Sequence, residues 1–209
     1  MRIPSAVVAV TLLLLLAGCI APSLHPICTA EDATVDPALL GTWLSEPAMG
    51  EEASQEVWTF EKGEDKAYRL TITADGMPAP FEARLVRLGG RLFLDLFPGR
   101  FEGDDRTAAK CLNGYCFLRC IPAHSIWSVH LEPDQLRLAA LDPDWLRETM
   151  AFGRLKLRCE ELEGGDLVIT AATKELQHFL SQHGGTTQAF DDPIVLLRQK
   201  QRPQQAQHP

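Results

Sequence analysis

The sequence predicts a mainly β fold, in which an antiparallel meander closes into a barrel of eight to ten strands with one C-terminal helix. Most segments between residues 41 and 199 are short and alternate apolar with polar residues, which is typical of strands that bury one face. Tight-turn signals separate many of them, so neighbouring strands should pair antiparallel. A single long meander avoids open edges most simply by closing on itself. Neither a β-α-β alternation nor an internal repeat is evident in the chain.

Ten segments are candidate strands. In chain order they are 41–45, 58–60, 68–72, 81–85, 92–96, 125–132, 135–141, 154–162, 166–171 and 193–199. Three pairs among them flank turn signals, namely Gly89-Gly90, residues 132–135 and residues 163–166. Gly89-Gly90 is a signal for a two-residue hairpin turn.

Some predicted strands are apolar on both faces. Leu85-Val86, Leu92-Phe93-Leu94 and Ile126-Trp127 all carry apolar side chains at consecutive positions. One face could line a cavity while the other packs under a helix or a partner. Burial on both faces without any cavity is an equally valid interpretation of the same pattern.

One helix is expected at residues 173–183. Thr173 is a candidate N-cap, and Glu175 in the first turn suits the helix dipole. Leu176, Phe179 and Leu180 form an apolar stripe, and the glycines at 184–185 end the helix. A shorter helical turn is possible at 143–151, where the preceding Asp-Pro-Asp sequence at 142–144 is typical of a turn and helix cap.

The N-terminus carries an export signal. A positive start at Arg2 precedes the apolar run 6–16, which is too short to span a bilayer comfortably. The run ends in Leu16-Ala17-Gly18-Cys19, which resembles the lipobox of bacterial lipoproteins. That resemblance implies cleavage before Cys19, acylation of its thiol with chains such as palmitate, and anchoring in a membrane. Ile20 in place of Asp implies sorting to the outer membrane, facing the periplasm.

These features predict a simple domain plan. Residues 1–18 form the lipoprotein signal peptide, 19–38 a lipidated extended tether, 39–199 the β domain and 200–209 a disordered tail rich in Gln and Pro. Removal of the signal peptide takes away one charge, that of Arg2, so the net charge changes from −8 to −9. This acidic balance argues against nucleic acid as a partner.

The start of the β domain resembles the lipocalins. Gly41-Thr42-Trp43 is similar to their Gly-x-Trp signature, in which the Trp plugs the closed end of the barrel. The whole stretch 39–199 also resembles an uncharacterised family of bacterial lipoproteins, which implies fold and address but no activity. The lipocalin Arg that stacks on this Trp has no counterpart near residues 170–173. Lys174 or Arg198 are the candidates to cover Trp43 by a cation–π contact instead.

The cysteines other than Cys19 predict disulfides, because export leads to an oxidising compartment. Asn113-Gly114 is a hairpin signal that places Cys111 opposite Cys116, within bridging distance. A second bridge is expected between Cys120 and either Cys159 or Cys28. Zinc held by Cys111, Cys116, Cys120 and His124 is the alternative, although thiols in this compartment tend to pair.

Catalytic motifs are not evident. The chain has neither a Gly-x-Ser-x-Gly elbow nor a glycine-rich phosphate loop after a strand. We therefore expect a protein that is not an enzyme and needs no cofactor. Its barrel would bind a small apolar ligand or an envelope protein, or else serve as a structural module filled by its own side chains. A hydrolase or redox protein built on the cysteines is the third hypothesis.

Overall fold

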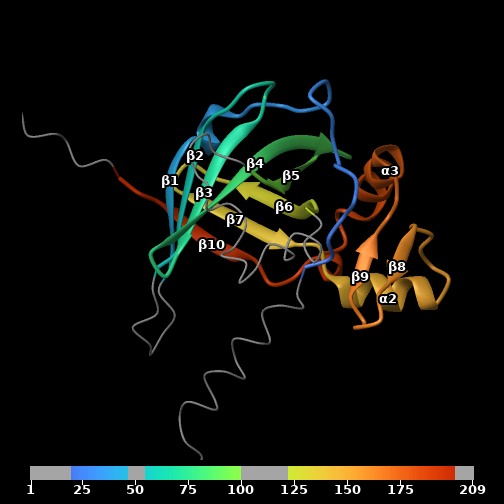
Figure 1. Cartoon of the computed structure of the whole chain (residues 1–209). Helices are drawn as coiled ribbons and strands as arrows, with labels where there is room; N and C mark the ends of the chain where they lie inside the picture. The colour runs from blue at the N-terminus through green and yellow to red at the C-terminus, as the bar shows by residue number, and fades with distance from the viewer. Residues whose placement is uncertain (1–19, 47–54, 100–121, 201–209) are drawn as a thin grey trace, which may run out of the picture.

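The structure, a computed structural model, describes residues 20–46, 55–99 and 122–200, and it confirms the predicted antiparallel barrel (Figure 1). Eight strands form the closed barrel: β1 (Gly41–Ser45), β2 (Val57–Lys62), β3 (Tyr68–Ala74), β4 (Met77–Leu88), β5 (Arg91–Pro98), β6 (Ser125–Leu131), β7 (Gln135–Ala140) and β10 (Ile194–Arg198). The first seven pair in chain order. Strand β10 pairs antiparallel with both β7 and β1, and this closes the sheet.

The predicted turns lie where the sequence places them. Gly89 and Gly90 join β4 to β5 with φ angles of 55° and 81°, a conformation that side chains with a Cβ adopt only with strain. Between β6 and β7, the amide of Glu132 donates to the carbonyl of Gln135. These turns set the register of the pairs on either side of them.

Two of the ten expected strands do not join the barrel. β8 (Cys159–Glu161) and β9 (Leu167–Ile169) form a separate two-stranded sheet, joined by the predicted turn at 163–166. The place beside β7 is taken by β10 instead, with Leu136 opposite Leu196. The barrel therefore has eight strands, the lower limit of the expectation.

Among the described residues, two α-helices stand outside the barrel. α2 (Pro143–Ala151) begins at the predicted cap, where Asp142 accepts hydrogen bonds from the amides of Asp144 and Trp145. α3 (Thr173–His183) has the predicted bounds, but its N-cap is Ala172 rather than Thr173, and the Ala172 amide donates to the Glu175 carboxylate at 3.0 Å. Within the described ranges, every helix is too short or too polar to cross a bilayer.

Residues 20–38 pack against the barrel, so the prediction of an extended tether is wrong for these residues. We call this segment the strap. Ser23 exchanges two backbone hydrogen bonds with His124, and the Leu24 amide donates to Ile169 in β9. Ala21, Ile27 and Cys28 are buried. The prolines in the strap do not prevent its apolar side chains from packing.

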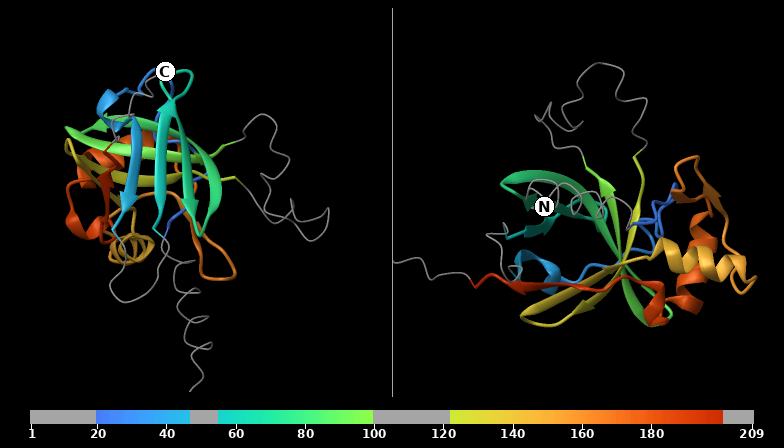
Figure 2. Two further views of the ribbon diagram at one scale, coloured as in Figure 1. Left: turned by 90° about the vertical axis from the view of Figure 1, so that its left-hand side faces the viewer. Right: turned by 90° about the horizontal axis from the view of Figure 1, so that it is seen from below.

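The described side chains form two hydrophobic cores. The inner core fills the barrel, and its buried members are Leu39, Trp43, Trp58, Phe60, Tyr68, Leu70, Ala83, Leu85, Leu94, Leu96, Leu136, Leu138 and Leu196. The outer core lies between the barrel wall and a layer made of the strap, α2, α3 and the β8–β9 sheet. Figure 2 shows that the two helices cover only one side of the barrel. Val86, Phe93 and Ile126 face this outer core, which explains why their strands are apolar on both faces.

Candidate functional site

The end of the barrel where β1 begins is closed by Trp43. Its ring is fully buried, and its indole Nε1 donates to the carbonyl of Leu39 at 2.9 Å. Leu39 belongs to the short 3-10 helix η2 (Pro37–Leu39), which precedes β1 directly. Tyr68 is buried in the same core, and its hydroxyl accepts from the amide of Asp36 at 2.7 Å. The strap is thereby fastened to the closed end.

Arg198 completes this closure, and of the two candidates it is the one that covers the tryptophan. Its guanidinium carbon lies 4.1 Å from the centroid of the Trp43 ring. Its Nε donates to the carbonyl of Pro133 at 2.7 Å, and its two terminal nitrogens donate to the carbonyls of Leu40 and Ala38. One side chain thus joins β10, the β6–β7 turn and the entry to β1. Such a planar fork of donors is available only to arginine.

Gly41 has a specific role beside Arg198. Its φ angle is 116°, which residues with a Cβ rarely adopt. A Cβ at this position would also lie 3.4 Å from the Arg198 guanidinium. The Gly-x-Trp sequence therefore supplies both the backbone bend and the ring that the arginine covers.

The interior of the barrel is densely occupied. Trp58 lies opposite Trp43 in the pairing of β1 with β2, and its ring meets that of Trp127 in a T-shaped contact with centroids 6.0 Å apart. The indole nitrogens of Trp58 and Trp127 donate to Glu56 and Ser125. Phe60 makes a second T-shaped contact, with Tyr68 at 6.1 Å. Aromatic rings in such edge-to-face pairs leave little space between them.

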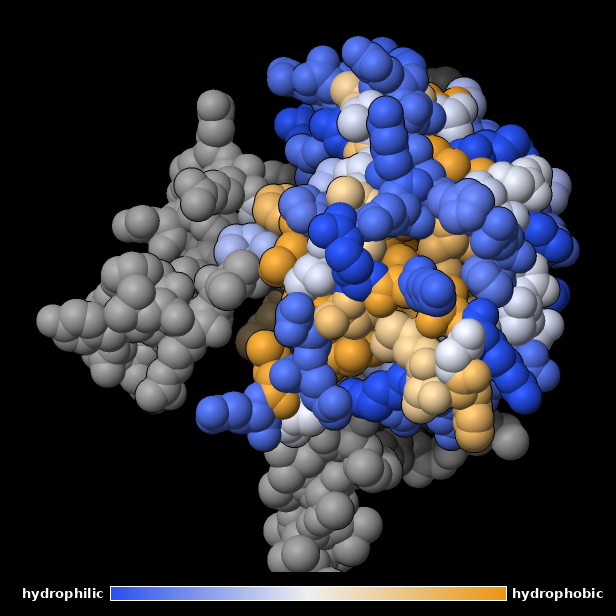
Figure 3. Space-filling view, turned by 90° about the vertical axis from the view of Figure 1, so that its right-hand side faces the viewer, coloured by the Kyte–Doolittle hydropathy of each residue, from blue (hydrophilic) through white to orange (hydrophobic). Residues whose placement is uncertain are grey.

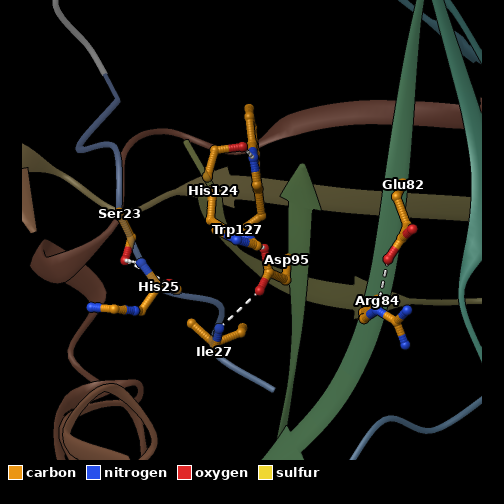
Figure 4. Close-up of polar contacts among 9 residues, drawn as sticks. Ser23, His25, Ile27, Glu82, Arg84, Asp95, His124 and Trp127 are labelled. Atoms are coloured by element: carbon orange, nitrogen blue, oxygen red, sulfur yellow. Dashed lines mark hydrogen bonds and ion pairs between the residues drawn. The ribbon is translucent and has the colours of Figure 1, made fainter. Parts of the chain in front are cut away.

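A second candidate site lies under the strap, on the outer face of β5 (Figure 4). The carboxylate of Asp95, 3% exposed, accepts the amide of Ile27 at 2.8 Å on one oxygen. Its other oxygen lies 2.7 Å from Nδ1 of His124. The His124 ring also packs against Phe97 with centroids 4.5 Å apart. Asp95 therefore connects the strap to β5 and to the start of β6.

A paired aspartate and histidine can orient a general base, but the neighbouring hydroxyl is engaged elsewhere. Ser23 is buried, and its Oγ donates to the carbonyl of His25 at 2.7 Å. The backbone of Ser23, not its side chain, is bonded to His124. The Asp95–His124 pair therefore has a structural role, which is to hold the strap against the barrel.

Sequence reasoning missed Asp95 as a functional residue. The signal is an acidic residue at the outward position of an otherwise apolar strand, between Phe93 and Phe97. A carboxylate buried in such surroundings requires donors, because its desolvation is costly. Those donors come from Ile27 and His124, which are distant in sequence.

Both cysteines in the described ranges, Cys28 and Cys159, are free thiols. The expected pairing of Cys159 or Cys28 with Cys120 is therefore not found, and the reason is that each packs as an apolar side chain in or against the outer core. Burial raises the pKa of Cys28 to about 12, with a further contribution from the charge of Asp95. Burial likewise raises the pKa of Cys159 to about 11.

These pKa values predict slow alkylation of the folded protein. At pH 8, the thiolate fraction of Cys159 is roughly a hundredfold below that of a thiol with a pKa near 9, and that of Cys28 is lower still. Labelling with iodoacetamide before and after unfolding, followed by peptide mass mapping, measures this difference. Labelling of folded Cys28 at the rate of the unfolded chain would contradict the burial. Labelling of Cys159 only after reduction would reinstate its disulfide.

Several predicted positions lie outside the described residues. They are the signal peptide 1–18, the lipidation site Cys19, the expected bridge between Cys111 and Cys116, Cys120 of both the second bridge and the zinc alternative, and the tail 201–209. His124 of the zinc alternative is described, and its Nδ1 is bonded to Asp95. Among the described residues, no group of three potential ligands is placed to hold a metal ion.

The fold and these sites define a closed antiparallel β-barrel with a strapped outer layer. Comparison of this chain with protein-family models, with curated proteins and with solved structures found no match.

Proposed function

We propose that this protein is a lipid-anchored, non-enzymatic module of the bacterial cell envelope, whose barrel is a scaffold filled by its own side chains. The packing of the interior carries the scaffold part of the proposal. Trp43, Trp58 and Leu85 are at most 3% exposed, and they come from three different strands. An eight-stranded barrel is narrow enough for side chains to fill it. The ligand-binding barrel is the competing interpretation.

The Leu-Ala-Gly-Cys sequence at 16–19 supports the anchor part of the proposal. Several acyl chains on Cys19 would hold the protein to the periplasmic leaflet of the outer membrane. One chain alone would not suffice, because stable anchoring takes more than one. The strap adds a geometric consequence. Only Ile20 lies between the anchor and Ala21, which is fully buried. The domain would therefore lie directly on the bilayer surface rather than at the end of a spacer.

The proposal that the protein is not an enzyme is supported by the structural roles of its candidate catalytic groups. The Asp95–His124 pair is used to fasten the strap. The Cys28 and Cys159 thiols have raised pKa values, so neither is activated as a nucleophile.

Metabolic labelling tests the anchor. The full chain expressed in a bacterial host should incorporate labelled palmitate and fractionate with the outer membrane, and Cys19→Ser should abolish both. Cys28→Ser is the matched control, because it removes a thiol from the strap and should leave the labelling unchanged. Equal labelling of the Cys19→Ser chain would contradict the proposed anchor.

Native mass spectrometry of the chain purified from its own membrane tests the scaffold. We expect no apolar ligand held inside the barrel. Leu94→Phe adds bulk to the filled interior, whereas Lys156→Glu changes only the outer surface. A molecule that co-purifies with the Lys156→Glu chain but is lost from a folded Leu94→Phe chain would lie in the barrel. That result would establish the ligand-binding barrel instead.

A further inference from the structure

A groove of about 660 Å³ lies outside the barrel, between α3 and the extended segment 154–158. Segment 154–158 follows α2 and precedes β8, and it alternates Arg, Leu, Lys, Leu and Arg. This alternation places Leu155 in the outer core and leaves Arg154, Lys156 and Arg158 exposed. Figure 3 views the side of the molecule that carries the two helices, where apolar surface is visible between hydrophilic side chains.

The charge of the groove is opposite to that of the protein. The chain has a net charge of −8, yet Arg154, Lys156, Arg158 and Lys174 line the groove and Glu175 is its one carboxylate. Glu175 is bonded to Arg158 at 2.7 Å, and this contact holds the pKa of the glutamate below its usual value. Among the described residues, the other three cations have no ion-pair partner. The groove therefore presents uncompensated positive charge.

The floor of the groove is apolar. Leu155 and Phe179 are 7% and 4% exposed, and Leu157 is half-buried beside them. The Phe179 ring stacks on His183 with centroids 5.5 Å apart, which fixes its position on α3. At the end of α2, Phe152 is 73% exposed and lies under the guanidinium of Arg154. An exposed aromatic ring beside cations suits the boundary between a polar headgroup and an apolar chain.

We propose that this groove binds an anionic amphiphile, a molecule with a phosphate headgroup and an acyl chain. Arg154, Lys156 and Lys174 bind the phosphate through charge-assisted hydrogen bonds. The first carbons of the chain lie on Leu157 and Phe179. A free phosphate would leave this apolar floor unused, and a nucleic acid would be repelled by the net charge of the protein. The proposal does not depend on acylation of Cys19.

Native mass spectrometry of the full chain, released from a neutral maltoside detergent, tests the proposal. The probes are dioctanoylphosphatidylglycerol, which is anionic, its zwitterionic phosphatidylcholine analogue, and inorganic phosphate. We expect the anionic lipid to bind about tenfold more tightly than either of the others. Equal binding of the zwitterionic lipid would overturn the role of the cations, and equal binding of inorganic phosphate would overturn the role of the floor.

Charge reversals locate the site. Lys156→Glu and Lys174→Glu are each expected to weaken binding of the anionic lipid by about tenfold, because each removes a charged hydrogen bond and adds repulsion. Lys200→Glu is the control, since it makes the same change in net charge beyond the end of β10. An equal loss in the Lys200→Glu chain would show binding by overall charge and overturn the groove. Both reversed residues are exposed, so folding is expected to persist and can be checked by circular dichroism.

Discussion

Replacing Trp43 with alanine is expected to lower the free energy of unfolding by about 4 kcal/mol. The Trp43 ring is fully buried, and its removal leaves a cavity at the closed end of the barrel. The hydrogen bond from Nε1 to Leu39 is lost as well, and Arg198 loses the ring beneath it. Urea unfolding of the full chain, followed by far-ultraviolet circular dichroism, measures the change without relying on tryptophan fluorescence.

Arg198→Lys provides a graded comparison for the same end of the barrel. Lysine keeps the charge but not the planar fork that reaches the carbonyls of Pro133, Leu40 and Ala38. We expect a loss of about 1–2 kcal/mol, smaller than that caused by Trp43→Ala. If Arg198→Lys destabilised the protein more than Trp43→Ala, then the hydrogen bonds and not the packed ring would hold this end closed.

Asp95→Ala is expected to cost about 3 kcal/mol and to release the strap. The substitution leaves the Ile27 amide and Nδ1 of His124 without their partner, and each unsatisfied buried group costs about 1–3 kcal/mol. The strap then lacks the hydrogen bond from the Ile27 amide that holds it to β5. Limited proteolysis under native conditions should cut within residues 20–38 of the variant well before it cuts the barrel.

Two controls accompany the Asp95 variant. Asp95→Asn keeps a side-chain acceptor of the same shape and should recover part of the stability. Asp192→Ala removes an exposed carboxylate and should change the free energy of unfolding by less than about 0.5 kcal/mol. Cleavage of the strap at the wild-type rate in Asp95→Ala would show that apolar packing alone retains it.

The barrel could be predicted because its signals are local. Alternation in β2, β3 and β4 and the glycine turn at 89–90 each depend on residues a few positions apart. For the strands that are apolar on both faces, the sequence pattern does not show which residues face the interior of the barrel and which face the outer core. Val86, Phe93 and Ile126 face the outer core, whereas Leu85 and Leu94 face the interior, and only the arrangement of the helices distinguishes these roles.

The packing of the strap and its bond to Asp95 could not be predicted, because the residues involved are distant in sequence. Proline-rich, weakly periodic sequence between residues 20 and 38 is typical of a linker. The segment is held in place because its backbone amides donate hydrogen bonds to Asp95 and to the carbonyl of Ile169. No local sequence pattern indicates either contact. Arg198 could be predicted only as one of two candidates to cover Trp43, because the choice depends on pairing between the first and last barrel strands.

The bonding of the strap on two sides also has a mechanical consequence. Around Ser23 the strap pairs antiparallel with His124 and parallel with Ile169. A force applied to the N-terminus acts along the strap, so it loads these bonds together in shear instead of opening them one after another. Resistance to such a pull is governed by the rate of forced opening rather than by equilibrium stability. A protein held at Cys19 and pulled away from its membrane would thus transmit the load into β6 and β9 without first unravelling its leading segment.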